Sequence, residues 1–143
     1  MISFKSKFQA WGGVVATFAI LLTCGCGGDP FERSQVTGKV TLDGEPIPYG
    51  EVLFSPDTEK GNSGPSVVAP IGPGGIYVTL SDRGAVPGPT IAMIVAFDNS
   101  PDAITGGGSP NLLVDNFPVE VEVPAGSGEI NFDLTSEEIR KRK

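Results

Sequence analysis

VTGKVTLDGEPIPYGEVLFSP, residues 36–56, is the stretch that predicts the fold most directly. Apolar residues or glycine alternate with polar residues over 36–42, which is the period of a strand with one buried face. Asp43-Gly44 is a turn dipeptide in which the glycine supplies a positive φ. A second apolar, alternating segment follows over residues 49–55. The stretch therefore predicts two strands that pair as a hairpin around a tight turn.

The remainder of the folded part contains five more segments of strand character, and these lie at residues 66–71, 76–80, 90–97, 117–123 and 130–134. Residues 90–97 are apolar on both faces, which predicts a central strand covered on both sides. The last two segments flank the turn Pro124–Gly128, so we expect them to form a C-terminal hairpin. Seven strands with turns at this spacing predict an all-β, antiparallel sandwich.

The composition limits the class of protein. The chain has 143 residues, 20 of them glycine and 13 proline, which suits one domain of short strands joined by many turns. Its formal net charge is −7 and its sequence pI is about 4.4. A nucleic-acid partner is therefore not expected, because binding phosphate requires a basic patch. The acidic surface is explained most simply as a solvated one.

The N-terminus has the organisation of a secretory signal. Lys5 and Lys7 precede an uncharged, mostly apolar run over residues 8–22, and small residues and cysteines follow. The run is short for a transmembrane helix, although an uncleaved N-terminal anchor is the alternative. We expect four parts, which are a signal peptide at 1–25, a cysteine and flexible tether at 26–34, a folded domain at 35–135 and a charged tail at 136–143.

The two cysteines follow the apolar run directly, in the sequence LTCGC at residues 22–26. This sequence resembles the lipobox of bacterial lipoproteins, in which a small residue precedes the cysteine that receives lipid. Cys26 follows Gly25 and is the preferred site, while Cys24, with Leu21 three residues before it, is the alternative. A Cys24–Cys26 disulfide would be strained, and no histidine or further cysteine is available to complete a zinc site.

The folded part resembles the carboxypeptidase regulatory-like domain of small bacterial lipoproteins of the planctomycete type. The pattern is V-x-G-x-V-x-x-D-G-x-P-(I/L)-x-x-(A/G)-x-V-x-F, followed later by G-x-Y and G-A-x-P-G. The matching residues are Val36, Gly38, Val40, Asp43, Gly44, Pro46, Ile47, Gly50, Val52, Phe54, Gly75–Tyr77 and Gly84–Gly88. Gly74 and Thr90 stand where the family usually has Asp and Tyr, and Pro-x-Lys-Tyr is absent before the penultimate strand. The resemblance implies a seven-stranded Greek-key sandwich of the transthyretin (prealbumin) type and no established activity.

Few residues have the spacing of a catalytic or metal site. Gly61–Pro65 is similar to the sequence around the nucleophile of trypsin-like proteases, but the chain has no histidine to act as base, which favours a simple turn. Asp98, Asp102 and Asp115 bracket a Gly-rich loop and are the candidate ligands for calcium, which prefers oxygen atoms. No Asp-x-Asp-x-Asp-Gly frame is present, so loop carboxylates that face water are the simpler interpretation.

The sequence therefore predicts a non-enzymatic, lipid-anchored protein of the cell envelope that faces the periplasm or the exterior and needs no cofactor. Its partners would be the membrane, through the N-terminal lipid, and a protein or glycan. Exposed sheet edges and the loop 99–111 are the expected contact surfaces. The alternatives are an accessory module that binds carbohydrate or peptide beside an envelope enzyme, and a carboxylate-dependent hydrolase.

Overall fold

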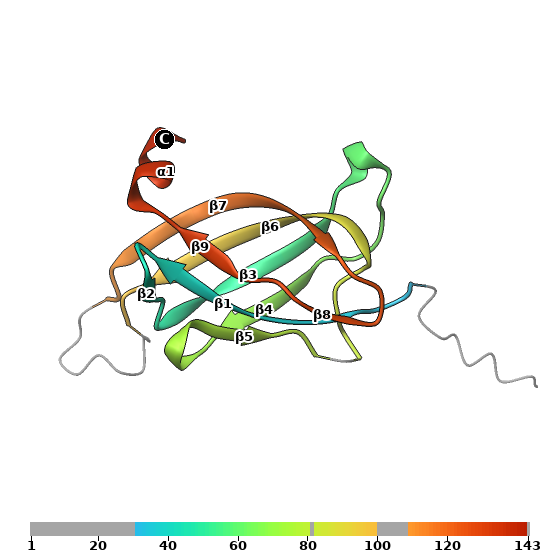
Figure 1. The fold of residues 1–143 in the computed structure, drawn as a ribbon, viewed down its shortest axis with the longest axis horizontal. Helices are drawn as coiled ribbons and strands as arrows, with labels where there is room; N and C mark the ends of the chain where they lie inside the picture. The colour runs from blue at the N-terminus through green and yellow to red at the C-terminus, as the bar shows by residue number, and fades with distance from the viewer. Residues whose placement is uncertain (1–30, 81, 100–108, 143) are drawn as a thin grey trace, which may run out of the picture.

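The computed structural model describes residues 31–80, 82–99 and 109–142, and strands dominate these ranges (Figure 1). The 3-10 turns η1 (Thr58–Lys60) and η2 (Pro73–Gly75) lie between strands, and one short helix ends the described chain. The other elements are β1 (Gln35–Leu42), β2 (Glu45–Pro46), β3 (Tyr49–Pro56), β4 (Val67–Ile71), β5 (Ile76–Val78), β6 (Gly88–Phe97), β7 (Leu112–Val123), β8 (Ser127–Glu129), β9 (Phe132–Leu134) and α1 (Ser136–Lys141).

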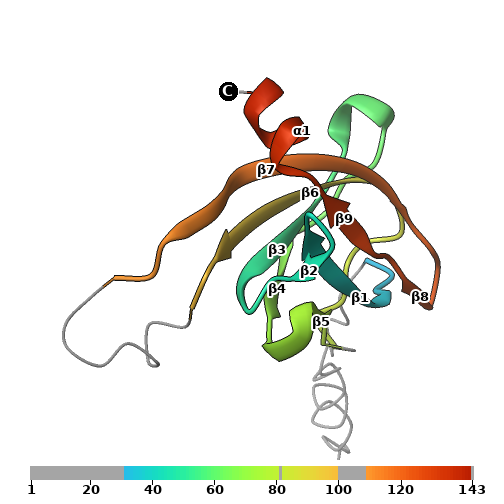
Figure 2. The same ribbon diagram turned by 60° about the vertical axis from the view of Figure 1, so that its left-hand side comes forward.

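The strands form one hydrogen-bonded path in the order β2-β1-β5-β4-β3-β6-β7. Every neighbouring pair along this path is antiparallel, which confirms the predicted all-β, antiparallel fold. Two short strands depart from that rule, because β8 and β9 both pair with β1 in parallel. The sheet is strongly curled, so that β1, β8 and β9 face β3, β6 and β7 across the interior (Figures 1 and 2). The two-sheet sandwich and its Greek-key topology stay predictions.

The pairing of both predicted hairpins is wrong. The turn at Asp43-Gly44 exists, with φ values of 52° and 87°, but it joins β1 to the two-residue β2. β3 pairs instead with β4 and β6. Likewise β7 pairs with β6, and β9 pairs with β1 rather than with β7. An alternating pattern identifies which face of a strand is buried, but it does not identify the partner strand.

Three aromatic rings from distant parts of the chain form the centre of the core. Phe54 on β3, Tyr77 on β5 and Phe132 on β9 have ring centroids 5.8–6.3 Å apart, in tilted arrangements. The Tyr77 hydroxyl donates a hydrogen bond of 2.5 Å to the backbone oxygen of Ile130. Burial raises the pKa of the Tyr77 phenol well above its ordinary value. The last strand described, β9, and the segment before it are therefore held to the core by ring packing and by this partly buried hydrogen bond.

Apolar residues on the outer face of the sheet are left partly exposed, although the sequence predicts that the central strand is covered on both sides. β6 lies between β3 and β7, as expected for a central strand, and buries Ala92 and Ile94 on its inner face. Met93 on its outer face is only half-buried, and no second layer covers this face in the described part of the chain. On β5 the buried residue is Tyr77, whereas Ile76 is 54% exposed. The predicted covering of β6 on both sides is thus wrong.

Within residues 31–80, 82–99 and 109–142, no helix has the length and apolar character that crossing a bilayer requires.

Candidate functional site

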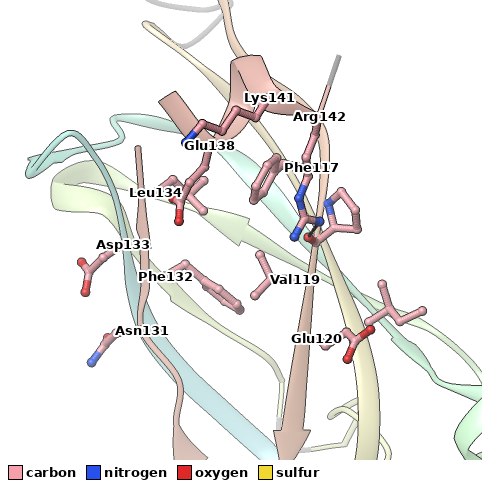
Figure 3. A pocket seen from close by; sticks show the side chains of 12 residues that line it. Phe117, Val119, Glu120, Asn131, Phe132, Asp133, Leu134, Glu138, Lys141 and Arg142 are labelled. Atoms are coloured by element: carbon pink, nitrogen blue, oxygen red, sulfur yellow. Dashed lines mark hydrogen bonds between the residues drawn. The ribbon is translucent and has the colours of Figure 1, made fainter. Parts of the chain in front are cut away.

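A groove of about 640 Å³ lies between β7 and β9 and extends under α1 (Figure 3). Each of the two strands is hydrogen-bonded to another strand, and the two are not paired with each other. Side chains rather than backbone hydrogen bonds therefore fill the space between them. The groove is lined by Ile91, Phe117, Pro118, Val119, Glu120, Asn131, Phe132, Asp133, Leu134, Glu138, Lys141 and Arg142.

The floor of the groove is apolar. It consists of Phe117 and Val119 on β7 and of Phe132 and Leu134 on β9. Phe132 and Val119 point toward each other across the gap, whereas Asn131 and Asp133 point away from it (Figure 3). Burying such side chains is favourable at about 25 cal/mol per Å² of apolar surface. Phe117, Phe132 and Leu134 are already buried, so an apolar group that enters the groove would gain free energy mainly from the burial of its own surface.

The helix α1 is fixed at the end of the groove by its N-terminal residues. Thr135 and Glu138 form a reciprocal capping box, in which each side chain bonds to the other residue's backbone N–H. Asp43, in the turn after β1, accepts hydrogen bonds from the Ser136 hydroxyl and from the Ser136 N–H, the latter at 2.9 Å. These bonds lower the pKa of the Asp43 carboxyl. A helix, rather than only a charged tail, therefore begins at Ser136.

The basic residues of the predicted charged tail make specific contacts with the domain. Arg142 places its guanidinium 4.8 Å from the centroid of the Phe117 ring, and its Nη1 donates a 2.9 Å hydrogen bond to the Pro118 oxygen. Lys141 pairs with Glu137 at 2.7 Å, one helical turn away. Because residue 118 is proline and lacks an N–H, this part of the β7 edge offers no donor to an added strand.

The carboxylates around the groove are each bonded to a neighbouring side chain. Asp133 accepts a 2.7 Å hydrogen bond from the Thr41 hydroxyl, and Glu120 lies 2.5 Å from the Lys60 ammonium. Glu138 belongs to the capping box of α1. The hydrogen bond from Lys60 to Glu120 raises the pKa of Lys60. These carboxylates therefore form a charged, hydrogen-bonded rim around the apolar floor of the groove.

Two of the three candidate calcium ligands, Asp98 and Asp115, lie among the described residues, and each is bonded to an asparagine. Asp98 accepts bonds from the Asn111 backbone N–H (2.8 Å) and side-chain amide (2.7 Å), and these bonds lower its pKa. Asp115 accepts a 2.9 Å bond from the Asn116 amide, while Asp102 lies outside the described residues. Among the residues that the structure describes, no group of three His, Cys, Asp or Glu side chains could hold a metal ion.

The protease-like stretch Gly61–Pro65 is a structural turn. Asp57 is buried and caps η1, accepting from the N–H groups of Glu59 and Lys60. The Asn62 amide then donates to the backbone oxygens of Pro87 and Pro89, at 3.1 and 2.8 Å. These bonds hold the turn against the segment that leads into β6, which agrees with the simple interpretation of the sequence.

Sequence patterns identified the groove residues but not the groove. The alternation at residues 117–123 and 130–134 marks each strand's buried face, yet the prediction paired the two strands and so closed the space between them. Only the capping box after residue 134 signalled that a helix follows. The signal segment and the lipidation candidates Cys24 and Cys26 lie outside the described residues. No protein-family model matches the chain, and no curated protein matches it.

Proposed function

We propose that the chain is a lipid-anchored protein of the cell envelope whose all-β domain is a non-catalytic binding module of the carboxypeptidase regulatory-like type. The observation that carries the binding role is the groove between β7 and β9, with its apolar floor and its bonded, charged rim. The anchor is supported by the order of basic residues, apolar run and LTCGC at the N-terminus.

An extended peptide is the ligand class that this site favours. β7 ends the hydrogen-bonded path, so its side away from β6 has no partner strand among the described residues. The Pro118 oxygen points to that side, since it accepts from Arg142. Backbone groups two residues apart point the same way in a strand, so Glu120 and Glu122 also present theirs there. A peptide could bond to this short edge while one apolar side chain enters the groove.

The floor residues also argue for peptide over glycan. Phe117 and Phe132 are 7% and 3% exposed, so their ring faces are not available as flat platforms on which a sugar could stack. An apolar floor accommodates a branched or aromatic side chain more readily than a hydroxylated ring, because hydroxyl groups without partners are costly to bury.

The anchor is tested by intact mass and membrane fractionation of the expressed protein, wild type against Cys26→Ala and Cys24→Ala. We expect an acylated, membrane-bound product that is lost only in the Cys26→Ala variant. Wild-type protein that keeps its first 25 residues and carries no lipid would contradict the anchor.

The binding role is tested by NMR titration of the full-length protein in detergent micelles with two probes, an alternating Val-Thr pentapeptide and a cello-oligosaccharide. We expect the peptide to shift amide signals of β7 and β9, and the shifts to be lost in Val119→Glu. The matched control is Leu113→Glu, an exposed leucine on β7 that does not line the groove and lies outside the β4–β5 strands. Shifts with the sugar alone would favour the carbohydrate-binding alternative.

A further inference from the structure

The outer face of β4 and β5 carries an exposed apolar surface. It consists of Val68, Ile76, Val78 and Leu80, which are 48%, 54%, 44% and 60% exposed, and we name these four residues the β4–β5 patch. The backbone remains paired beyond β5, because the Thr79 N–H bonds to the Val36 oxygen at 2.8 Å. The three alternating residues of the patch therefore share one side of the sheet. Clustered apolar side chains of this kind mark contact surfaces on proteins.

The described chain enters the domain beside this patch. Ser34 bridges to Ala85 with backbone bonds of 2.8 and 2.9 Å, and the Arg33 guanidinium donates to the Gly84 oxygen. The Phe31 ring lies against Gly64, where an added Cβ would come within 3.2 Å of it. A shallow cleft of about 360 Å³ joins this entry point to the patch, and it is lined by Arg33, Pro65, Ser66, Val67, Val68, Leu80 and Arg83.

We propose that the β4–β5 patch, together with the Arg33/Arg83 cleft, is the surface with which the domain rests on the bilayer that holds its anchor. The inference rests on the N-terminal anchoring of the proposed function. Four residues lie between Cys26 and Phe31, and the five steps from one Cα atom to the next span at most about 18 Å in an extended chain. The end of the domain that contains Phe31 must then lie close to the lipid headgroups.

The chemistry of the surface suits a bilayer interface. Apolar side chains enter the boundary between headgroups and acyl chains, and arginine binds phosphate with several donors at once. Arg83 pairs with Asp82 at 3.7 Å, but both side chains are more than 70% exposed, so this ion pair is weak and can be exchanged for a lipid phosphate. Glu32 and Asp82 lie at the same end, so the apolar contact and not net charge provides most of the attraction.

A short tether also explains how a small patch suffices. Four side chains would bind a membrane only weakly from free solution, but tethering converts binding into an intramolecular step at high effective concentration. A second copy of the chain has no such advantage, because no tether brings two patches together. The outcome would be a domain held in one orientation, with the β7–β9 groove on the face that does not carry the patch (Figure 2).

The test places a single tryptophan in the patch of the full-length, membrane-expressed protein. Trp11 is the only native tryptophan, so all variants carry Trp11→Phe. Leu80→Trp probes the patch, and Leu112→Trp is the matched control, since Leu112 is 49% exposed and pairs with Phe97 at the far end of the ten-residue β6. Both proteins are reconstituted in phosphatidylcholine–phosphatidylglycerol vesicles with and without lipids brominated on their acyl chains.

We expect bromolipid to quench the Leu80→Trp protein about twice as strongly as the Leu112→Trp protein, because interfacial side chains sit roughly 5–10 Å deep. Adding Arg83→Gln to Leu80→Trp should reduce the quenching. Equal quenching at the two positions would overturn the inference. A blue-shifted emission without quenching would also overturn it, because it would show that protein, such as a second copy, covers the patch.

Intact mass of the same samples separates this inference from the proposed anchor. Acylated protein with an unquenched Leu80→Trp indole would contradict the docking surface alone. Protein that floats with vesicles but carries no acyl chain would contradict the lipid anchor. The difference in bromolipid quenching between Leu80→Trp and Leu112→Trp would still test the docking surface. Protein that neither carries lipid nor floats would contradict both.

Discussion

Gly38, at the scale of a single residue, lies where β1 passes close to the segment before β9. An added Cβ would be 1.8 Å from the Ile130 oxygen and 2.8 Å from Cε1 of Tyr77. The same Ile130 oxygen accepts the Tyr77 hydroxyl. We therefore expect Gly38→Ala to destabilise the fold by about 3 kcal/mol or more, because the backbone must move and this partly buried hydrogen bond is disrupted. Urea unfolding followed by circular dichroism measures the change.

The matched control for Gly38 is Gly72→Ala. Gly72 has a φ of −100°, and the nearest atom to an added Cβ there is the Ile76 oxygen at 3.7 Å, an ordinary contact. We expect its stability to change by less than about 1 kcal/mol. A Gly38→Ala protein as stable as Gly72→Ala would contradict the steric argument.

At the scale of an element, α1 depends on a side chain outside the helix. The pKa of Asp43 is lowered because Ser136 donates to its ionised form. Its contribution to holding α1 is therefore present above the ordinary value of 3.8, and is lost as the pH falls through the lowered value. We expect Asp43→Ala to speed hydrogen exchange of the Ile139 amide, which bonds to the Thr135 oxygen, severalfold at neutral pH.

Glu45→Gln is the control for this element, because Glu45 is an exposed carboxylate of the same hairpin. Its exchange rate at Ile139 should match that of the wild type. Wild-type and Asp43→Ala proteins should become alike as the pH falls below the lowered pKa of Asp43. A difference between them that persists in acid would show that Asp43 acts through packing rather than through its charge.

At the scale of the whole molecule, the fold is closed by its two ends. β9 pairs with β1, and Leu42 is opposite Leu134 across 92 residues of sequence. Phe132 and Leu134 are buried in the core, and losing two such side chains costs about 5 kcal/mol or more. This is comparable with the 5–15 kcal/mol that stabilises a typical domain. We therefore expect truncation after Val123, which removes β8, β9 and α1, to abolish cooperative thermal unfolding.

Truncation after Thr135 is the matched comparison, since it removes α1 and keeps β8 and β9. Residues 136–142 include no buried side chain. We therefore expect the protein truncated after Thr135 to unfold cooperatively, at a lower temperature than the full-length protein. Calorimetry of both truncated proteins distinguishes the two cases. A cooperative transition in the protein that ends at Val123 would mean that the β1–β7 sheet is stable without its parallel closure.

Alternation along single strands let the sequence alone determine the fold class. The inner faces of β1, β3 and β7 follow from the period-2 pattern, because a half-buried strand must put its apolar residues on one side. The tight turn at Asp43-Gly44 and the cap at Thr135 are equally local, since each depends on the chemistry of adjacent residues.

Only the tertiary structure decided which strands pair with one another. Nothing local distinguishes a β9 that pairs with β7 from one that pairs with β1, because both arrangements bury Phe132 and Leu134. The orientation of β5 is also a tertiary effect, because Tyr77 faces the core and the more apolar Ile76 does not. Only the assembled interior supplies the Ile130 oxygen, which accepts the hydrogen bond of the Tyr77 hydroxyl. The groove and the exposed patch both follow from these choices, because burial depends on what lies across the core and not on the neighbouring residues in the sequence.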